Sequence, residues 1–191
     1  MAQGIDYLLK QGDCVIRKTA NILFYVIAAF YIFMMIDLFF RFNYMFDTDR
    51  IVSRSYNLIP FKTIWGYASR NNHVSFADIN ILGNIVVFIP YGIYLGVIKK
   101  RKGFMISFVI VAATSLFIEI TQFIFGLGAC DIDDVILNTI GGIIGIIGYK
   151  LLRRVLKEES RTKTAITAIS LIFGIPIIYL YFTTVFNHLR L

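Results

Sequence analysis

Five stretches of this 191-residue chain are each long and apolar enough to cross a lipid bilayer as a helix. A helix satisfies its backbone hydrogen bonds internally, as the interior of a membrane demands. With 58% hydrophobic residues and a mean hydropathy of +0.72, the chain is too apolar for a soluble domain. The sequence therefore predicts an all-α integral membrane bundle of about five transmembrane helices, forming one membrane domain over residues 1–191. The spans are expected at approximately residues 20–40, 79–98, 104–125, 132–152 and 164–186.

Basic residues predict how the bundle is oriented. Lys and Arg are enriched in the cytoplasmic loops of membrane proteins. With the N-terminus inside, 13 of the 19 Lys and Arg residues fall on the cytoplasmic side. We therefore expect a cytoplasmic N-terminus, an extracytoplasmic C-terminus and an extracytoplasmic loop over residues 42–78. Residues 1–19 are polar and only weakly amphipathic, which favours a cytoplasmic tail over an interfacial helix.

The net charge of +7 would suggest a nucleic-acid partner in a soluble protein. In this chain the basic residues flank the apolar stretches, so membrane topology and anionic lipids explain them better. The sequence also lacks base-reading motifs. We therefore expect membrane lipids as partners and no nucleic acid.

Polar and small residues form one stripe on each of two neighbouring spans. Residues three and four apart share a helix face, and small residues let helices approach closely in lipid. We expect the two striped faces to pack together, with the carboxyl groups clustered at one end. The stripe of the later span contains Asp131, Asp134, Asn138, Gly141, Gly145 and Gly148. The stripe of the earlier span contains Ala112, Ser115, Glu119, Gln122 and Gly126.

The predicted topology brings polar groups of three spans to one level. Asn84, Glu119 and Asn138 all fall within roughly 10 Å of the outer ends of their helices, at ~1.5 Å per residue. The loop that carries Arg54 and Asn57 lies over the same face. An ionisable side chain within a membrane costs upwards of ~2.5 kcal/mol, so a functional role is the default expectation. The sequence therefore predicts a polar, acidic site in the outer leaflet.

Four motifs in this order resemble the VanZ-like family of bacterial membrane proteins, over a core of approximately residues 41–150. They are Arg54-x-x-Asn57-Leu-x-Pro60-Phe61, Gly83-Asn84-Ile-x-x-Phe88-x-Pro90-x-Gly92, Glu119-x-x-Gln122 and Asp131-Ile-Asp-Asp134-x-x-Leu-Asn138-Thr-x-Gly141. The resemblance implies the bacterial cytoplasmic membrane and an association with resistance to teicoplanin, a glycopeptide antibiotic. Many relatives carry an arginine where Leu127, Gly128 and Ala129 stand here, so any role of that arginine is either absent from this chain or passes to Arg54.

The function that we favour is the recognition or modification of a cell-envelope component at this site. Such a component could be a lipid-linked cell-wall precursor or a lipoglycopeptide. A planar guanidinium is suited to gripping phosphate or carboxylate, which makes Arg54 a candidate ligand-binding residue. The full set of candidate ligand-binding residues is Arg54, Asn57, Asn84, Gln122, Asp133 and Asn138.

Three alternatives stay open. In an enzyme that acts on a lipid-linked substrate, Glu119, Asp131 and Asp134 could serve as acid and base or hold Mg²⁺. No histidine cluster, nucleophilic serine motif or metal-type cysteine spacing accompanies them, so neither a dedicated metal site nor a cofactor is predicted. In a transporter they would line a proton path. In a purely structural protein the polar residues would be hydrogen-bonding contacts between helices.

Overall fold

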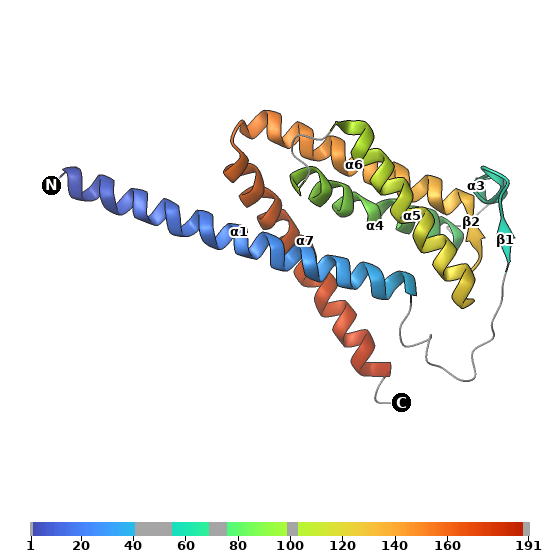
Figure 1. Ribbon diagram of the computed structural model, residues 1–191. Coiled ribbons are helices and arrows are strands. Elements are labelled where there is room, and N and C mark those ends of the chain that lie inside the picture. The colour runs from blue at the N-terminus through green and yellow to red at the C-terminus, as the bar shows by residue number, and fades with distance from the viewer. Residues whose placement is uncertain (1, 41–54, 69–75, 99–102, 189–191) are drawn as a thin grey trace. The chain divides into compact units, whose positions relative to one another are not determined.

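A computed structural model of the chain describes residues 2–40, 55–68, 76–98 and 103–188. Six helices and two short strands form in these residues (Figure 1). The helices are α1 (Ala2–Phe40), α3 (Lys62–Ala68), α4 (Phe76–Ile98), α5 (Phe104–Phe125), α6 (Ile132–Leu156) and α7 (Glu159–His188). The strands are β1 (Tyr56–Asn57) and β2 (Cys130–Asp131), which pair in parallel.

Five of the helices are long and apolar enough to cross a membrane, which confirms the predicted all-α membrane bundle. The apolar spans are Lys18–Phe40, Asn80–Ile98, Phe104–Phe125, Ile132–Leu156 and Glu159–Thr183. The first helix differs from the expectation, because α1 begins at Ala2 and runs without a break into the span. The expected polar tail is therefore helical. A helix once nucleated adds one hydrogen bond per residue, so the adjoining span favours helix in residues that show only a weak pattern of their own.

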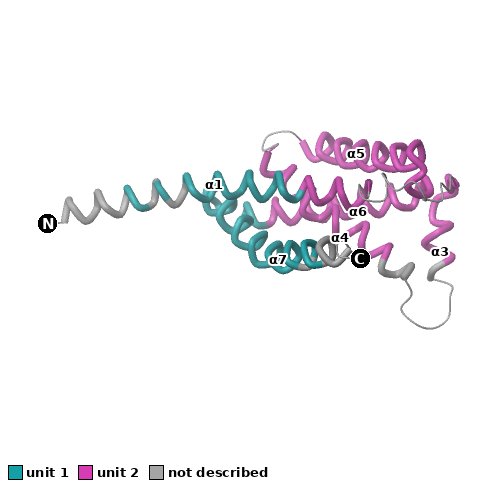
Figure 2. Tube along the Cα trace, turned by 90° about the horizontal axis from the view of Figure 1, so that it is seen from below, with its two compact units in different colours: residues 1–31, 152–191 teal, residues 32–151 magenta. Residues whose placement is uncertain are grey.

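The chain divides into two compact units, coloured separately in Figure 2. Unit 1 contains residues 1–31 and 152–191, and unit 2 contains residues 32–151. Within unit 2, α4, α5 and α6 lie side by side in both views (Figures 1 and 2). Unit 2 also holds both strands and α3, so all the candidate site residues that the structure describes belong to it.

Glycines of α6 lie directly against the backbone of α4. A Cβ atom on Gly141 would overlap the carbonyl oxygen of Ile85, and one on Gly145 would overlap that of Ile89. Reciprocally, a Cβ on Gly92 would overlap the carbonyl oxygen of Gly142. The helices can approach this closely only because these positions carry no side chain.

This contact corrects the glycine half of the predicted pairing of the two stripes. The polar half is confirmed, because Asn138 of the later stripe donates a hydrogen bond to Ser115 of the earlier stripe at 2.9 Å. The glycines Gly141 and Gly145 face α4 and not α5, and nothing lies within 4 Å of the position of a Cβ on Gly148. Contact with α5 comes instead from Gly142, where a Cβ would meet Val111. The spacing of the stripe misassigned the neighbour of the glycines because two helices flank α6. A stripe of small residues does not determine which of the two helices it contacts.

Aromatic side chains fill the centre of unit 2. Phe88 of α4 is fully buried and meets the rings of Phe39 and Tyr91 edge to face, with centroids 5.9 and 5.6 Å apart. The hydroxyl groups of Tyr91 and Thr114 are 2.8 Å apart, which joins α4 to α5. α4 remains helical through Pro90. These contacts fix the three helices whose ends carry the polar residues.

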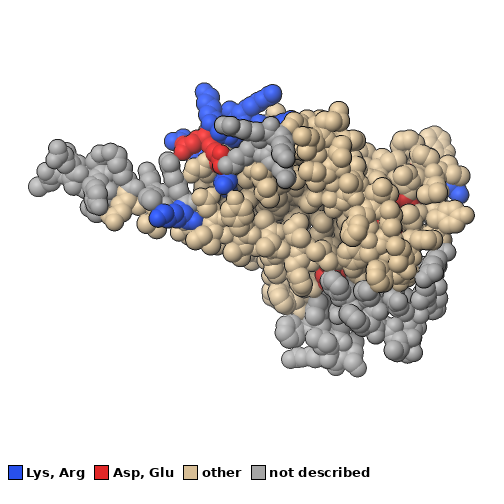
Figure 3. Space-filling view, viewed as in Figure 1, with Lys and Arg blue, Asp and Glu red and all other residues tan. Residues whose placement is uncertain are grey.

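Charged side chains gather where α6 gives way to α7. Arg161 pairs with Glu158 at 3.0 Å and Lys163 pairs with Glu159 at 3.7 Å, both within unit 1. Lys163 also lies 5.9 Å from the ring centre of Phe24 in α1, a cation–π contact. Figure 3 shows the Lys, Arg and acidic residues around this connection, whereas the visible surface of the spans is almost uncharged. This distribution fits helices surrounded by lipid.

Candidate functional site

The loop segment that contains α3 is fastened to the start of α6 by Asp133. Its carboxyl group is completely buried and accepts hydrogen bonds from the backbone N–H groups of Phe61 at 2.5 Å, Thr63 at 2.7 Å and Ile64 at 3.2 Å. The first N–H groups of a helix have no partner within it, so Asp133 caps α3 from another part of the chain. Phe61 has φ 63°, a left-handed conformation that costs roughly 1–2 kcal/mol in a residue with a side chain. The bond to Asp133 stabilises it.

Asp131 joins three elements. Its Oδ1 accepts from the backbone N–H of Asp133 at 2.9 Å, the N-cap contact that begins α6. The same oxygen accepts from Asn57 Nδ2 at 3.1 Å, and Oδ2 accepts from the Thr63 hydroxyl at 2.6 Å. Asn57 lies in β1, which pairs with Asp131 in β2. The carboxyl group of Asp131 therefore holds the loop, the hairpin and α6 together.

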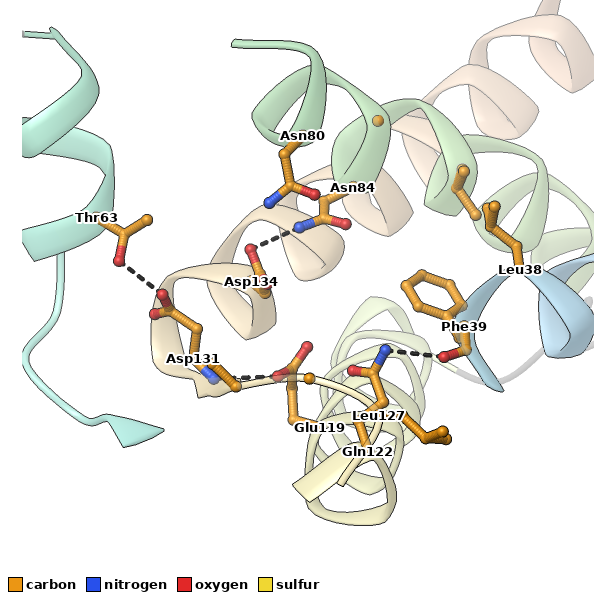
Figure 4. A pocket seen from close by; sticks show the side chains of 14 residues that line it. Leu38, Phe39, Thr63, Asn80, Asn84, Glu119, Gln122, Leu127, Asp131 and Asp134 are labelled. Atoms are coloured by element: carbon orange, nitrogen blue, oxygen red, sulfur yellow. Dashed lines mark hydrogen bonds between the residues drawn. The ribbon is translucent and has the colours of Figure 1, made fainter. Parts of the chain in front are cut away.

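The hairpin between α5 and α6 places Glu119 beside Asp131. Gly126 ends α5 in a left-handed conformation with φ 65°, which glycine adopts without strain, so this residue is a helix cap and not part of the predicted stripe. Glu119 is only 2% exposed, and its Oε2 accepts from the backbone N–H of Asp131 at 3.1 Å. In Figure 4 its other oxygen points into an open space between α4, α5 and α6.

Three polar contacts connect the helices around this space. Asn84 of α4 donates to Asp134 of α6 at 2.6 Å, and Gln122 of α5 donates to the backbone carbonyl of Phe39 at 2.9 Å. Deeper in the bundle, Asn138 of α6 donates to Ser115 of α5 at 2.9 Å. These bonds are of the kind that the structural alternative predicts, and each contributes about 0.6 kcal/mol on average. Asn84 and Gln122 line the space, and their amide oxygens are not used in the bonds to Asp134 and Phe39 (Figure 4).

The space is a cavity of about 510 Å³. Its walls come from the end of α1, from α3, α4 and α5, from the hairpin and from the start of α6, and Figure 4 shows how the side chains converge on it. Among the described residues that line the cavity, none is Lys or Arg. The lining consists of Leu38, Phe39, Thr63, Asn80, Gly83, Asn84, Val87, Glu119, Gln122, Leu127, Gly128, Ala129, Asp131 and Asp134.

The carboxyl groups also affect the free thiol of Cys130, which lies between α5 and α6 and outside both spans. Partial burial raises the pKa of Cys130, and the negative charges of Glu119 and Asp131 raise it further. The thiol therefore stays protonated at neutral pH and is a weak nucleophile. This observation gives no support to a cysteine-based reaction.

The predicted site residues separate into three groups. Glu119, Asp131, Asp134, Asn84 and Gln122 line the cavity. Asn57, Asp133 and Asn138 do not line it and take part in the contacts that hold its walls. Arg54 lies outside the described residues.

Sequence reasoning did not assign Leu38, Phe39, Thr63, Asn80 or Val87 to the site. Asn80 shares a helix face with Asn84, and that spacing could have identified it. The other four are ordinary apolar or loop residues without a distinguishing pattern.

In the part of the chain that the structure describes, no group of three or more His, Cys, Asp and Glu residues is arranged to hold a metal ion. The carboxyl groups of Asp131 and Asp133 are instead engaged by backbone and side-chain donors. The chemistry available at the cavity is that of carboxyl, amide and hydroxyl groups at its polar wall and of apolar contact at the α1 side.

These features define a multi-pass helical membrane protein with a polar cavity at one end of its spans. The chain belongs to the VanZ/LLP1 family, which it matches over residues 22–153. It is also 34% identical over 126 residues to Protein VanZ of Enterococcus faecium, an alignment that covers 66% of this chain and 71% of the relative. No solved structure matches the chain significantly. The resemblance seen in the four motifs is thus confirmed.

Proposed function

We propose that this protein recognises a component of the bacterial cell envelope in the cavity between α4, α5 and α6, and that recognition contributes to resistance to teicoplanin-type glycopeptides. The observation that carries the proposal is the cavity itself, with Glu119, Asp131 and Asp134 in one wall. Three carboxyl groups so close together are costly in a membrane protein. If these three residues served only as contacts between helices, neutral amide side chains would make the same contacts equally well.

The lining indicates what kind of ligand the cavity accepts. Carboxyl and amide oxygens are hydrogen-bond acceptors, and a buried acceptor without a donor costs about 1–3 kcal/mol. The ligand therefore supplies donors, either the hydroxyl groups of a sugar or an amine. Leu38, Phe39 and Val87 add an apolar wall that accommodates the lipid-proximal part of the same molecule. A lipid-linked cell-wall precursor and a lipoglycopeptide both combine these two characters.

The proposed side of the membrane follows from the charge distribution. With 13 of the 19 basic residues on the cytoplasmic side, the N-terminus is cytoplasmic, the C-terminus is extracytoplasmic and the cavity opens to the extracytoplasmic face. Cell-wall precursors and glycopeptide antibiotics meet at that face. The bacterial cytoplasmic membrane is therefore the proposed location.

The test is expression of the chain in a teicoplanin-susceptible bacterium, with the inhibitory concentration of teicoplanin as the readout. The parent chain should raise that concentration, and Asp134→Asn should abolish the increase at equal abundance in the membrane. Glu158→Gln removes one negative charge in unit 1 and is the matched control. Equal protection by Asp134→Asn and the parent would separate resistance from the cavity and contradict the proposal.

A further inference from the structure

The loop segment from Tyr56 to Ala68 exposes an unusual number of large apolar side chains. Tyr56 is 72% exposed, Leu58 65%, Ile59 60%, Phe61 59% and Trp65 74%. Single exposed apolar residues are ordinary, but five within ten positions form a patch that is rarely left in water. Two of the five, Tyr56 and Trp65, are of the types enriched where a membrane meets water.

Many backbone groups of this segment have partners within the protein. The N–H groups at the start of α3 bond to the buried carboxyl group of Asp133. Trp65 N–H bonds to the carbonyl of Phe61 at 2.8 Å, and the carbonyl of Ser55 accepts from Cys130 N–H at 3.0 Å. An unsatisfied backbone group costs several kcal/mol in lipid, so satisfied ones are a requirement for a segment that enters the interface.

Contacts with β2 and α6 also hold the segment at the level where the spans end. β1 pairs with β2, and Asp133, which caps α3, lies in the first turn of α6. α6 is one of the five spans, and its first residue follows β2 directly. Figure 1 shows α3 and β1 at the end of unit 2 where α6 begins. That end of a span is the boundary between hydrocarbon and headgroups.

The charge of the segment also favours contact with a lipid surface. Lys62 is the one charged residue between Tyr56 and Ala68, and it is exposed. A lysine can keep its ammonium group among lipid phosphates while its aliphatic stem lies along apolar groups. One cation with no acidic residue in an aromatic patch is complementary to a phospholipid surface.

We propose that residues 56–68 form an interfacial anchor, whose apolar side chains rest in the headgroup and upper acyl layer of the bilayer. The partner is phospholipid. The anchor goes beyond ligand recognition, since it requires no occupant of the cavity. Because Thr63 of α3 lines the cavity, the anchor also fixes the depth at which the cavity meets the membrane.

Trp65 makes the test direct, because it is the only tryptophan in the chain. The full chain is reconstituted into vesicles of phosphatidylcholine and phosphatidylglycerol, and Trp65 fluorescence is measured. Lipids brominated close to the headgroup should quench it more strongly than lipids brominated near the chain end. The emission should be shifted to shorter wavelength than that of tryptophan in water.

A second variant supplies the depth reference. Trp65→Phe combined with Phe117→Trp moves the single tryptophan to an exposed site within the span of α5, where deep bromines should quench most. Trp65→Phe alone measures the background. Water-like emission quenched by iodide, with no response to brominated lipid, would overturn the anchor. So would emission that changes with the ratio of protein to lipid, which indicates that a second copy covers the patch.

Discussion

The carboxyl group of Asp133 accepts a hydrogen bond from the backbone N–H of Thr63 at 2.7 Å, at a sequence separation of 70 residues. Thr63 in turn donates through its hydroxyl to Asp131. Thr63 is thus bonded both to the last residue of β2 and to the first turn of α6. This pair of contacts sets one wall of the cavity, since Thr63 and Asp131 both line it.

Replacing Asp133 should release the loop segment. Asp133→Ala leaves the N–H groups of Phe61, Thr63 and Ile64 without their acceptor and should destabilise the fold by roughly 3 kcal/mol. Asp133→Asn keeps one acceptor oxygen and should cost less. Thermal unfolding in detergent and proteolysis between residues 56 and 68 measure the effect. Unchanged protection in Asp133→Ala would show that the cap does not hold α3.

The glycine contacts on α6 make opposite predictions for two positions. Gly145→Ala should destabilise the protein by about 1–3 kcal/mol, because a Cβ there overlaps the Ile89 carbonyl of α4. Gly145→Leu should reduce folding yield in detergent. The matched control is Gly148→Ala, which has open space and gains helix propensity, so its stability should be unchanged or raised. Similar melting temperatures for the two alanine variants would be inconsistent with the close α4–α6 approach.

Glu119→Gln separates a ligand site from a structural contact. The amide oxygen can still accept from Asp131 N–H, so stability should stay within about 1 kcal/mol of the parent. Resistance should nevertheless be lost if the carboxyl group meets the ligand. Ser115→Ala removes only the bond to Asn138 away from the cavity and should keep resistance. Teicoplanin susceptibility and thermal stability, measured together, distinguish a ligand-binding role of Glu119 from a structural one. Full resistance in Glu119→Gln would favour the structural alternative.

Thiol labelling of Cys130 tests both topology and electrostatics. A membrane-impermeant maleimide should reach Cys130 in intact cells, and Cys14 only after permeabilisation. Because the pKa of Cys130 is raised, little thiolate is present at neutral pH, and the labelling rate should increase about tenfold per pH unit below that pKa. The reverse pattern, with Cys14 labelled first, would contradict the proposed orientation.

Sequence patterns predicted the membrane bundle and the clustering of Glu119, Asp131 and Asp134, because both follow from local rules. Hydropathy marks spans, and three-and-four spacing marks a helix face. Those rules could not tell that Gly145 faces α4, since the choice between two neighbouring helices depends on tertiary packing. They also could not foresee the helical start of α1, where propagation from the span outweighs weak local preference.

The site was predicted unevenly for a similar reason. Asp133 and Asn57 carry groups typical of ligand binding, yet their partners are backbone and side-chain donors brought in by the loop. Leu38 and Phe39 line the cavity only because α1 ends there, and an apolar residue at a helix end is indistinguishable from one that faces lipid. Which polar groups stay available to a ligand depends on these long-range contacts, and no local pattern encodes them.

The fastening of α3 by Asp133 also sets an order of events during synthesis. Residues 56–68 leave the ribosome well before the carboxyl group that will cap them, and α4 and α5 are made in between. Residues 56–68 therefore lack the cap that Asp133 provides until the start of α6 has been synthesised. A nascent chain that is arrested before residue 131 lacks Asp131 and Asp134, which line the cavity, and Asp133, which holds α3. The cavity can therefore form only after the start of α6 has been synthesised.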